Sequence, residues 1–149
     1  MIDLLTRGWH ALRPVQGWIA WLISAKLAVG VTGIVRDADG RLLLLRHRLW
    51  PPESQWGFPS GFARHGETFQ QAIVREVREE TGLVVTVGRL LEVHSGQRLK
   101  AEVYYEARLV GGIAGLVVDR REILEARLFT LDSLPAAMPP LHRRLAHGG

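Results

Sequence analysis

The stretch GFARHGETFQQAIVREVREETGL, residues 61–83, decides more about this chain than any other part of it. Its second half carries three glutamates, Glu76, Glu79 and Glu80, at helical spacing. Carboxylates on one helix face repel one another, so they are rarely placed together for stability alone. The spacing therefore predicts that a cation lies among them. Hard divalent ions take oxygen ligands and bridge to phosphate groups, so phosphate chemistry is the first hypothesis.

Both ends of the helix are marked in the sequence. Thr68, followed three residues later by Gln71, predicts a capping box at the start. Gly82 stands where a left-handed cap would end the helix. The predicted helix therefore follows Thr68 and stops at Gly82.

The faces of this helix follow from an advance of 100° per residue. One side is apolar, and the three glutamates occupy an adjoining arc of roughly 100°. Arg75 is assigned to the far side, one turn before Glu79, where it can hold that carboxylate by an ion pair. The apolar side is expected to pack on a sheet and consists of Ile73, Val74, Val77 and Thr81. The alternative is a solvated Glu/Arg face, as most charge runs are.

The wider pattern resembles the Nudix box in full. Five residues separate Gly61 from Glu67, and seven more precede the run from Arg75 to Leu83. The flanks 56–59 and 131–135 are also similar to the family, so the resemblance covers about residues 28–135. It implies an α/β/α sandwich with a mixed β-sheet, and a hydrolase that acts on phosphoanhydride bonds.

Length and composition fit one small domain. The chain has 149 residues, enough to bury a core, and no cysteine, which excludes disulfides and cysteine nucleophiles. Its net charge of +4 is carried mostly by arginine, which suits an anionic substrate. The basic residues are spread along the chain without a nucleic-acid-binding motif, so a nucleotide-type small molecule is expected and no nucleic acid.

Residues 1–27 differ from the Nudix-like domain expected at residues 28–149. They predict an apolar helical extension carrying Trp9, Trp18 and Trp21. The apolar stretch is interrupted and comes late, which argues against a membrane span and a cleaved signal peptide and favours a cytoplasmic protein. The favoured interpretation is packing on the domain or on a second subunit of a homodimer. Contact with a membrane surface and a lid over the substrate are the less favoured alternatives.

Strand patterns follow on both sides of the box. Residues 29–36 and 41–46 predict a hairpin, and the four leucines 42–45 suit a strand buried on both faces. Further strands are predicted at 83–87, 90–93, 102–109 and 123–130, and Pro139-Pro140 opens a last helix. Strands punctuated by two helices predict an α/β sandwich. In the strand 102–109, Tyr104 is assigned to the polar face.

The resemblance implies roles for particular residues. Glu76, Glu79 and Glu80 correspond to ligands of Mg²⁺, for which Mn²⁺ is a substitute. The carbonyl of Ser60 is expected to join them, and Glu67 to support the loop or reach the metal through water. Arg75 is expected to orient a catalytic glutamate.

The general base is left open by the sequence. It is either a helix glutamate, Glu79 or Glu76, or Glu122 from a later loop, with Glu125 as a second loop candidate. The alternative for both loop residues is a solvated acid.

Substrate contacts are predicted from residue type and place. Arg46, Arg48 and Arg64 are the candidates for binding phosphates through bidentate hydrogen bonds, with a solubility role as the alternative. Trp50 and Tyr104 are candidates for stacking on a base. The histidines are interpreted as surface or packing residues.

The expected activity is magnesium-dependent hydrolysis of the diphosphate linkage in a nucleoside diphosphate joined to another moiety. A nucleotide sugar is the preferred class. ADP-ribose stays open, although the proline of typical ADP-ribose enzymes is absent and Arg98 and Leu99 stand in its place. The alternatives are a nucleoside triphosphate pyrophosphohydrolase and a non-catalytic nucleotide-binding module.

Overall fold

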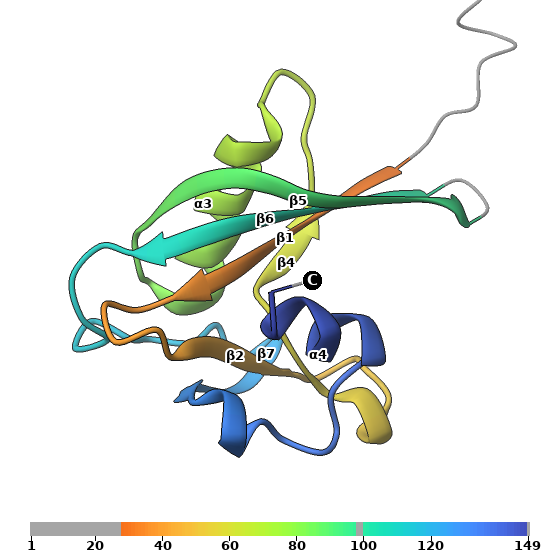
Figure 1. The fold of residues 1–149 in the computed structure, drawn as a ribbon. Helices are drawn as coiled ribbons and strands as arrows, with labels where there is room; N and C mark the ends of the chain where they lie inside the picture. Colours follow the sequence, from red (N-terminus) through yellow and green to blue (C-terminus); the bar gives the residue numbers. More distant parts are fainter. Residues whose placement is uncertain (1–27, 98–99, 149) are drawn as a thin grey trace, which may run out of the picture.

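A computed structural model describes residues 28–97 and 100–148 of the chain (Figure 1). The predicted N-terminal helical extension lies outside the described residues, and its packing and the homodimer stay predictions. In chain order the elements are β1 (Ala28–Arg36), β2 (Leu42–His47), the 3₁₀ helix η1 (Pro52–Ser54), β3 (Trp56–Gly57), β4 (Ser60–Phe62), α3 (Phe69–Thr81), β5 (Val85–Gln97), β6 (Lys100–Leu109), β7 (Ile123–Phe129), the 3₁₀ helix η2 (Leu131–Ser133) and α4 (Pro140–Ala146).

The strands form one seven-stranded sheet with the order β3-β2-β1-β6-β5. Strand β4 pairs with β1, and β7 pairs with β2. Strands β1 and β6 run parallel over nine partner pairs from Ala28↔Lys100 to Arg36↔Arg108, while the other pairings are antiparallel. The sheet is therefore mixed, as the resemblance implies.

The predicted hairpin is formed at only one point. Strands β1 and β2 are partners at Arg36↔Leu42, and beyond that point β1 pairs with β6 and β2 pairs with β7. The four leucines of β2 are fully buried, as predicted. Because successive side chains of a strand face opposite ways, they enter the two cores in alternation. The leucine strand therefore lies between two packed layers instead of forming a simple ribbon.

Two hydrophobic cores lie on the two faces of the sheet. The core under α3 joins Ile73 and Val77 to strand residues such as Val103. The core under α4 joins Leu145 to Ile34 and its neighbours. Figure 1 shows the two helices on different sides of the strands. The chain is thus an α/β sandwich of helix, mixed sheet and helix.

The assignment of Tyr104 to a polar face was wrong. The residue is 2 % exposed and packs in the core under α4, because that helix covers the face of β6 on which Tyr104 lies. The two strands predicted at 83–87 and 90–93 are one strand, β5, whose pairing with β6 shifts register between Val87 and Leu90. A bulge of this kind interrupts the alternation that marks a strand in a sequence.

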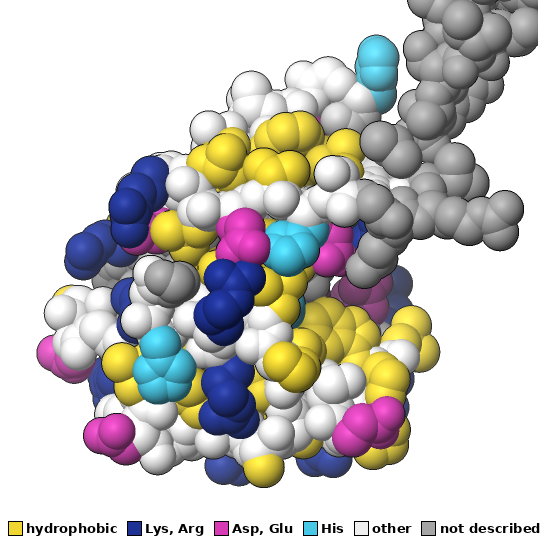
Figure 2. Space-filling model, turned by 45° about the vertical axis from the view of Figure 1, so that its right-hand side comes forward, with side chains coloured by type: hydrophobic (Ala, Val, Ile, Leu, Met, Phe, Trp, Pro, Cys, Tyr) yellow, Lys and Arg dark blue, Asp and Glu magenta, His cyan; other side chains and the backbone are white. Residues whose placement is uncertain are grey.

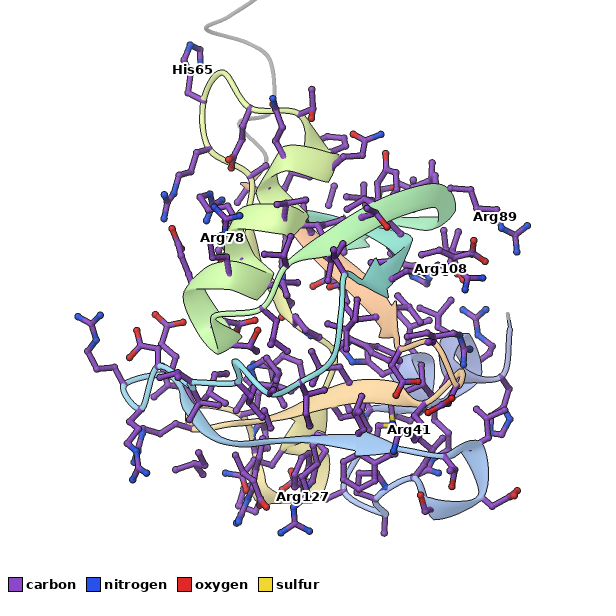
Figure 3. The ribbon with its side chains drawn as sticks, turned by 90° about the vertical axis from the view of Figure 1, so that its left-hand side faces the viewer. Arg41, His65, Arg78, Arg89, Arg108 and Arg127 are labelled. Atoms are coloured by element: carbon purple, nitrogen blue, oxygen red, sulfur yellow. The ribbon has the colours of Figure 1, made fainter. Side chains whose placement is uncertain are left out.

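Charged side chains are distributed over several elements. Arg78, Arg89 and Arg108 project outward from α3, β5 and β6, and His65 lies at the tip of the loop before α3 (Figure 3). On the face drawn in Figure 2, basic, acidic and hydrophobic side chains lie next to one another. Among the residues that the structure describes, neither helix is long and apolar enough to cross a membrane.

Candidate active site

Helix α3 begins and ends as the sequence predicts. The Thr68 hydroxyl accepts a hydrogen bond from the Gln71 amide at 3.2 Å, and the Gln71 side chain accepts one from the Thr68 N–H at 2.8 Å. Gly82 closes the helix with φ of 70°. Ile73 and Val77 are buried against the sheet. The caps and the apolar face together fix the rotation of the helix about its axis. This rotation turns the glutamate flank, the side that carries Glu76, Glu79 and Glu80, toward a cleft.

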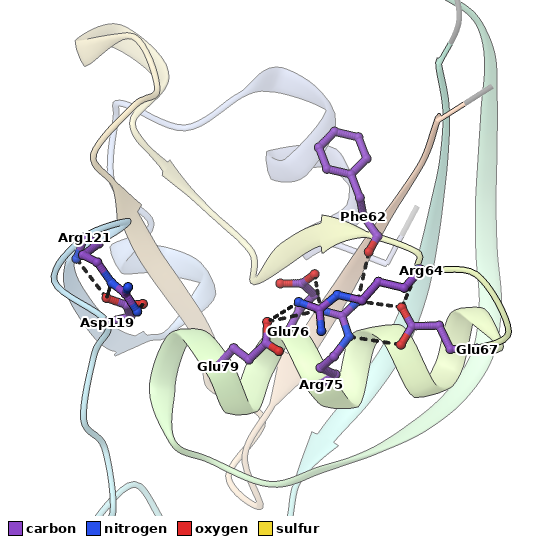
Figure 4. Close-up of polar contacts among 8 residues, drawn as sticks. All are labelled: Phe62, Arg64, Glu67, Arg75, Glu76, Glu79, Asp119 and Arg121. Atoms are coloured by element: carbon purple, nitrogen blue, oxygen red, sulfur yellow. Dashed lines mark hydrogen bonds and ion pairs between the residues drawn. The ribbon is translucent and has the colours of Figure 1, made fainter. Parts of the chain in front are cut away.

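Arg75 connects the helix to the loop before it (Figure 4). Its guanidinium donates two hydrogen bonds to Glu67, at 3.0 and 2.6 Å, and one each to Glu76 at 2.6 Å, Glu79 at 3.2 Å and the Phe62 carbonyl at 2.9 Å. The side chain is 18 % exposed, so its assignment to the far side of the helix was wrong. The long arginine stem folds back over the glutamate flank, where the planar fork reaches three carboxylates.

This network shifts the pKa values of its members. The hydrogen bonds from Arg75 hold the pKa of Glu67 at about 2, and Glu67 in turn raises the pKa of Arg75. The loop carboxylate therefore stays ionised and anchors the guanidinium. Neither group is among the residues that line the cleft.

Glu76 and Glu79 reach the cleft from the same helix flank. The Glu76 carboxylate lies against the backbone of Gly61, where an added Cβ would overlap it. Burial raises the pKa of Glu76 against the opposing effect of Arg75. Glu79 is more exposed and accepts a hydrogen bond from Arg64 at 3.2 Å. Gly61 thus leaves room for the close approach of a carboxylate to the loop.

Glu80 is the most buried of the three, with 3 % exposure. Its carboxylate accepts a hydrogen bond from the Ser60 N–H at 3.2 Å and lies 3.9 Å from Nδ1 of His47. Within the described residues no lysine or arginine forms an ion pair with it. Burial, first of all, and then three neighbouring carboxylates, Glu76, Glu122 and Glu79, together raise the pKa of Glu80 to about 9 against the opposing effect of the Ser60 N–H. A buried carboxylate among other carboxylates is a place where a cation would be strongly favoured.

These groups open onto a cleft of about 1150 Å³. One wall is the glutamate flank of α3 with Arg64, and a second is the loop that carries Asp119, Arg121 and Glu122. Arg121 is bound to Asp119 at 3.1 Å and is largely exposed (Figure 4). The floor and far wall come from β1, β6, the loop after β2 and α4, and include Glu102, Tyr104, Trp50 and His142. The cleft is large enough for a nucleotide derivative.

The structure brings most of the predicted site residues together. Six of them line the cleft: Glu76, Glu79, Glu80, Ser60, Arg64 and Glu122. Of Ser60, the structure shows the N–H engaged with Glu80, and the predicted role of its carbonyl stays a prediction.

Two predicted phosphate-binding residues lie elsewhere. Arg46 donates to the Gln55 side chain at 2.8 Å, and Arg48 donates to the carbonyl of Arg120 at 2.8 Å. Neither belongs to the cleft lining. Arg48 instead steadies the loop that carries Arg121 and Glu122. The second loop candidate for a base, Glu125, is on β7 opposite Arg46 and also lies outside the lining.

Several cleft residues were not indicated by the sequence patterns. His47 and His142 are 6 % exposed and bracket the backbone of Phe58: the Phe58 N–H donates to Nδ1 of His142, and His47 Nε2 donates to the Phe58 carbonyl, both at 3.3 Å. Arg121 was not singled out among the chain's many arginines. No local spacing links these positions, because they come together only through strand pairing and the docking of α4.

The carboxylates suit a hard divalent ion by their chemistry. In the part of the chain that the structure describes, no three His, Asp or Glu side chains converge on one point. Glu76 and Glu79 are held by Arg75, so both would have to rotate to share an ion with Glu80. The donor set itself, carboxylate oxygens next to a backbone loop, is the kind that Mg²⁺ takes. The residues therefore fit the ion in type and neighbourhood.

A mixed sheet between helices, with a capped glutamate helix beside an arginine-lined cleft, defines the class of protein. A family model described as NUDIX domain matches residues 26–147. The chain therefore belongs to the NUDIX family.

Individual comparisons agree with the family. The chain is 34% identical over 110 residues to an ADP-ribose pyrophosphatase of Methanocaldococcus jannaschii, covering 72% of this chain and 64% of that protein. It is 29% identical over 131 residues to the NAD-capped RNA hydrolase NudC of Mycobacterium tuberculosis, covering 88% of this chain and 41% of that protein. A solved NUDIX hydrolase from Nitrosomonas europaea has the same fold, with a TM-score of 0.72, 24% identity and coverage of 83% and 72%. The chain thus spans less than two thirds of the length of these two curated relatives.

Proposed function

We propose that this protein is a magnesium-dependent hydrolase that cleaves the diphosphate linkage of a nucleoside diphosphate joined to another moiety. The observation that carries the proposal is Glu80, a buried carboxylate with three further carboxylates around it and no basic side chain paired to it among the described residues. Such a group is costly to ionise unless a cation joins it. Its position on the wall of a cleft that also holds Arg64 and Arg121 supports a phosphate-bearing ligand.

In this mechanism, Glu76, Glu79 and Glu80 would hold the metal ion, with Mn²⁺ as a substitute for Mg²⁺. A bound ion supplies neutralisation of phosphate charge and makes water more acidic. Arg75 holds Glu76 and Glu79 on the cleft side of the helix through its hydrogen bonds of 2.6 and 3.2 Å, from which both carboxylates would turn toward the ion. Arg64 and Arg121 bind the outer phosphate oxygens.

The chemical step is the attack of water on one phosphorus. The bond between that phosphorus and the bridging oxygen breaks, and a nucleoside monophosphate and a phosphorylated partner leave. The proton of the water passes to a carboxylate. We assign this role to Glu122, because it is exposed in the cleft and close enough to Glu80 to raise its pKa.

The substrate class follows from the cleft and the relatives. The cleft of about 1150 Å³ has room for a nucleotide joined to a second moiety. The name of the relative from Methanocaldococcus jannaschii refers to ADP-ribose, a nucleoside diphosphate joined to a sugar. We therefore place nucleotide sugars and ADP-ribose together as the proposed class.

A product analysis tests the proposed function. The full chain is incubated with Mg²⁺ and one compound at a time from a panel of ADP-ribose, a nucleotide sugar, a dinucleotide and a deoxynucleoside triphosphate. We expect a nucleoside monophosphate and a sugar phosphate from the first two, and no turnover when a chelator removes the metal. Release of pyrophosphate from the triphosphate alone would support the nucleotide-pool enzyme instead. Binding without turnover in all cases would support the non-catalytic module.

A pair of loop and strand variants tests the base. We expect Glu122→Gln to lower kcat by about 10²–10³-fold, because a general base contributes on that scale. Glu125→Gln is the matched control, since Glu125 pairs with Arg127 outside the cleft, and it should stay within about twofold of the wild type. The measurement is kcat against pH for the three proteins. Equal activities of the two variants would exclude Glu122 as the general base and favour a helix glutamate, Glu79 or Glu76.

A further inference from the structure

The cleft has a second polar group, away from the glutamate helix. Its components come from β6 and α4, and no role in metal binding or proton transfer involves them. Glu102 and Tyr104 lie on the cleft side of β6, and His142 lies on α4.

The Glu102 carboxylate is fixed in orientation and only partly used. Tyr104 donates its hydroxyl proton to Oε2 at 2.8 Å, and the Lys100 ammonium lies 2.5 Å from Oε1. These two partners hold the carboxylate ionised by lowering its pKa against the opposing effect of burial. A carboxylate has about four acceptor positions, so two remain for a ligand in the cleft.

The His142 ring carries a donor that lacks a partner. Because its Nδ1 accepts from the Phe58 N–H, the neutral ring must carry its proton on Nε2. Within the described residues this Nε2–H makes no hydrogen bond, although the residue is only 6 % exposed and lines the cleft. Trp50 and Tyr104 contact the ring edge to face, at 5.7 and 6.0 Å between centroids, and hold it in place.

Glu102 and His142 lie near each other, since Tyr104 contacts both side chains. The charge of Glu102 acts on His142, raising its pKa, while the larger effect of burial lowers that pKa to about 4 and keeps the ring neutral. The register of the strands also gives the distance between β6, which carries Glu102, and the strand that contacts the glutamate helix. Phe62, Gly30 and Glu102 are neighbours across β4, β1 and β6. Two strand spacings, about 10 Å, thus separate β6 from the strand β4 that touches Glu76 and Glu80.

We propose that Glu102 and His142 form a subsite that binds the hydroxyl groups of a vicinal diol on a sugar of the substrate. A sugar hydroxyl both donates and accepts, so it can donate to the carboxylate and accept from the imidazole N–H. An ionised carboxylate only accepts hydrogen bonds, so Glu102 suits a hydroxyl donor and not a phosphate oxygen. Gly30 leaves this floor without a side chain, and Glu102 and Lys100 lie over it. This inference rests on the proposed function and narrows its substrate to compounds that carry a diol.

The test compares variants and substrates in a matrix. Wild type, Glu102→Gln and the control Glu106→Gln are assayed with ADP-ribose, with its 2′-deoxyadenosine analogue, and with ADP esterified to a simple alcohol. Glu106 is on the same strand, pairs with Arg89 and lies outside the cleft. For ADP-ribose we expect Glu102→Gln to raise KM by about 10–100-fold with kcat changed little, the scale of one hydrogen bond to a charged group. Glu106→Gln should match the wild type.

Comparison of the three substrates shows which sugar of the ligand the subsite recognises. If the nucleoside ribose is recognised, the effect of Glu102→Gln disappears with the deoxy analogue; if the distal sugar is recognised, it disappears with the simple ester. An equal effect on all three substrates indicates a structural role and overturns the inference. His142→Phe, which keeps the ring volume and removes the donor, should show the same substrate pattern if its circular dichroism matches the wild type. Should it fail to fold, the Glu102 matrix decides alone.

If the protein proves not to be a hydrolase, the subsite is tested by ligand binding instead. If the wild type hydrolyses none of the panel, the same three ligands are titrated calorimetrically into wild type and Glu102→Gln. A weaker affinity of the variant for the diol-bearing ligand alone supports the subsite without catalysis. Equal affinities, or no binding, overturn it.

Discussion

Replacing Glu80 with glutamine is expected to abolish hydrolysis and, at the same time, to stabilise the metal-free protein. The loss of activity should reach at least about 10³-fold in kcat, because a metal ligand controls several kcal/mol of transition-state stabilisation. Glu53→Gln, an exposed change on η1, should leave kcat unaltered. The measurement is the initial rate of nucleoside monophosphate release at saturating Mg²⁺.

The gain in stability follows from the buried charge. Folding raises the pKa of Glu80 from 4.5 to about 9, so between these values the folded protein holds a proton that the unfolded chain has released. This contribution is complete below pH 4.5 and declines as the pH rises toward 9. Glutamine is neutral at every pH, so the variant does not lose stability in this way as the pH rises. At pH 7 its free energy of unfolding should exceed that of the wild type by on the order of 3 kcal/mol.

Thermal unfolding at several pH values checks this prediction. The melting temperatures of wild type and Glu80→Gln should coincide near pH 4.5 and diverge above it, with the variant higher. Addition of Mg²⁺ should raise the melting temperature of the wild type alone, because binding to the folded state stabilises it. A variant that is less stable than the wild type at pH 8, or that keeps its response to Mg²⁺, contradicts the role given to Glu80.

The second large effect is expected for Arg75→Met. This change removes every hydrogen bond to Glu67, Glu76 and Glu79 while keeping a side chain of similar length. The carboxylates lose their shared cation and repel one another, so we expect the melting temperature at pH 7 to fall by about 10 °C. Activity should fall by about 10–100-fold, as for other groups that orient metal ligands. Arg78→Met on the same helix, which removes an exposed arginine, is the matched control.

The pH dependence separates the ion-pair role of Arg75 from simple packing. In the wild type, the lowered pKa of Glu67 gives stability that is present above its unfolded pKa of 4.5 and is lost as the pH falls toward 2. The variant has no such contribution to lose. The difference in melting temperature should therefore shrink as the pH falls below 4.5. Arg75→Lys should restore only part of the stability, because an ammonium cannot bond two carboxylate oxygens in parallel. A difference independent of pH indicates lost packing alone.

The local structure of α3 could be predicted because its causes are local. A threonine and a glutamine three residues apart form the capping box wherever the chain turns into a helix, and Gly82 supplies the left-handed cap. The position of the glutamate flank follows from the helical repeat and the apolar face. The sequence therefore predicted the helix, its buried side and the mixed α/β sandwich, which the comparisons and the structure confirm.

The predictions that were wrong concern contacts between distant segments. Tyr104 was placed on a polar face because alternation along the strand groups it with Glu102 and Glu106, but α4, some forty residues later, covers that face. The predicted hairpin forms only next to its turn, because most of β1 pairs with β6, about seventy residues away. Arg75 was assigned by helical geometry alone, while its strongest partner, Glu67, lies in the loop before the helix.

By itself, the sequence determined the family, the helix with its caps, and the set of acidic residues offered to a cation, since each depends on residues within a few turns of one another. Only the tertiary structure decided which acid is buried, which arginines reach the cleft, and which groups form its far wall. Glu80 lies beside His47 and the Ser60 amide, and His142 lies beside Phe58, because separate segments pack together. Burial and charge are properties of that packing, and the pKa values and binding groups of the site follow from it.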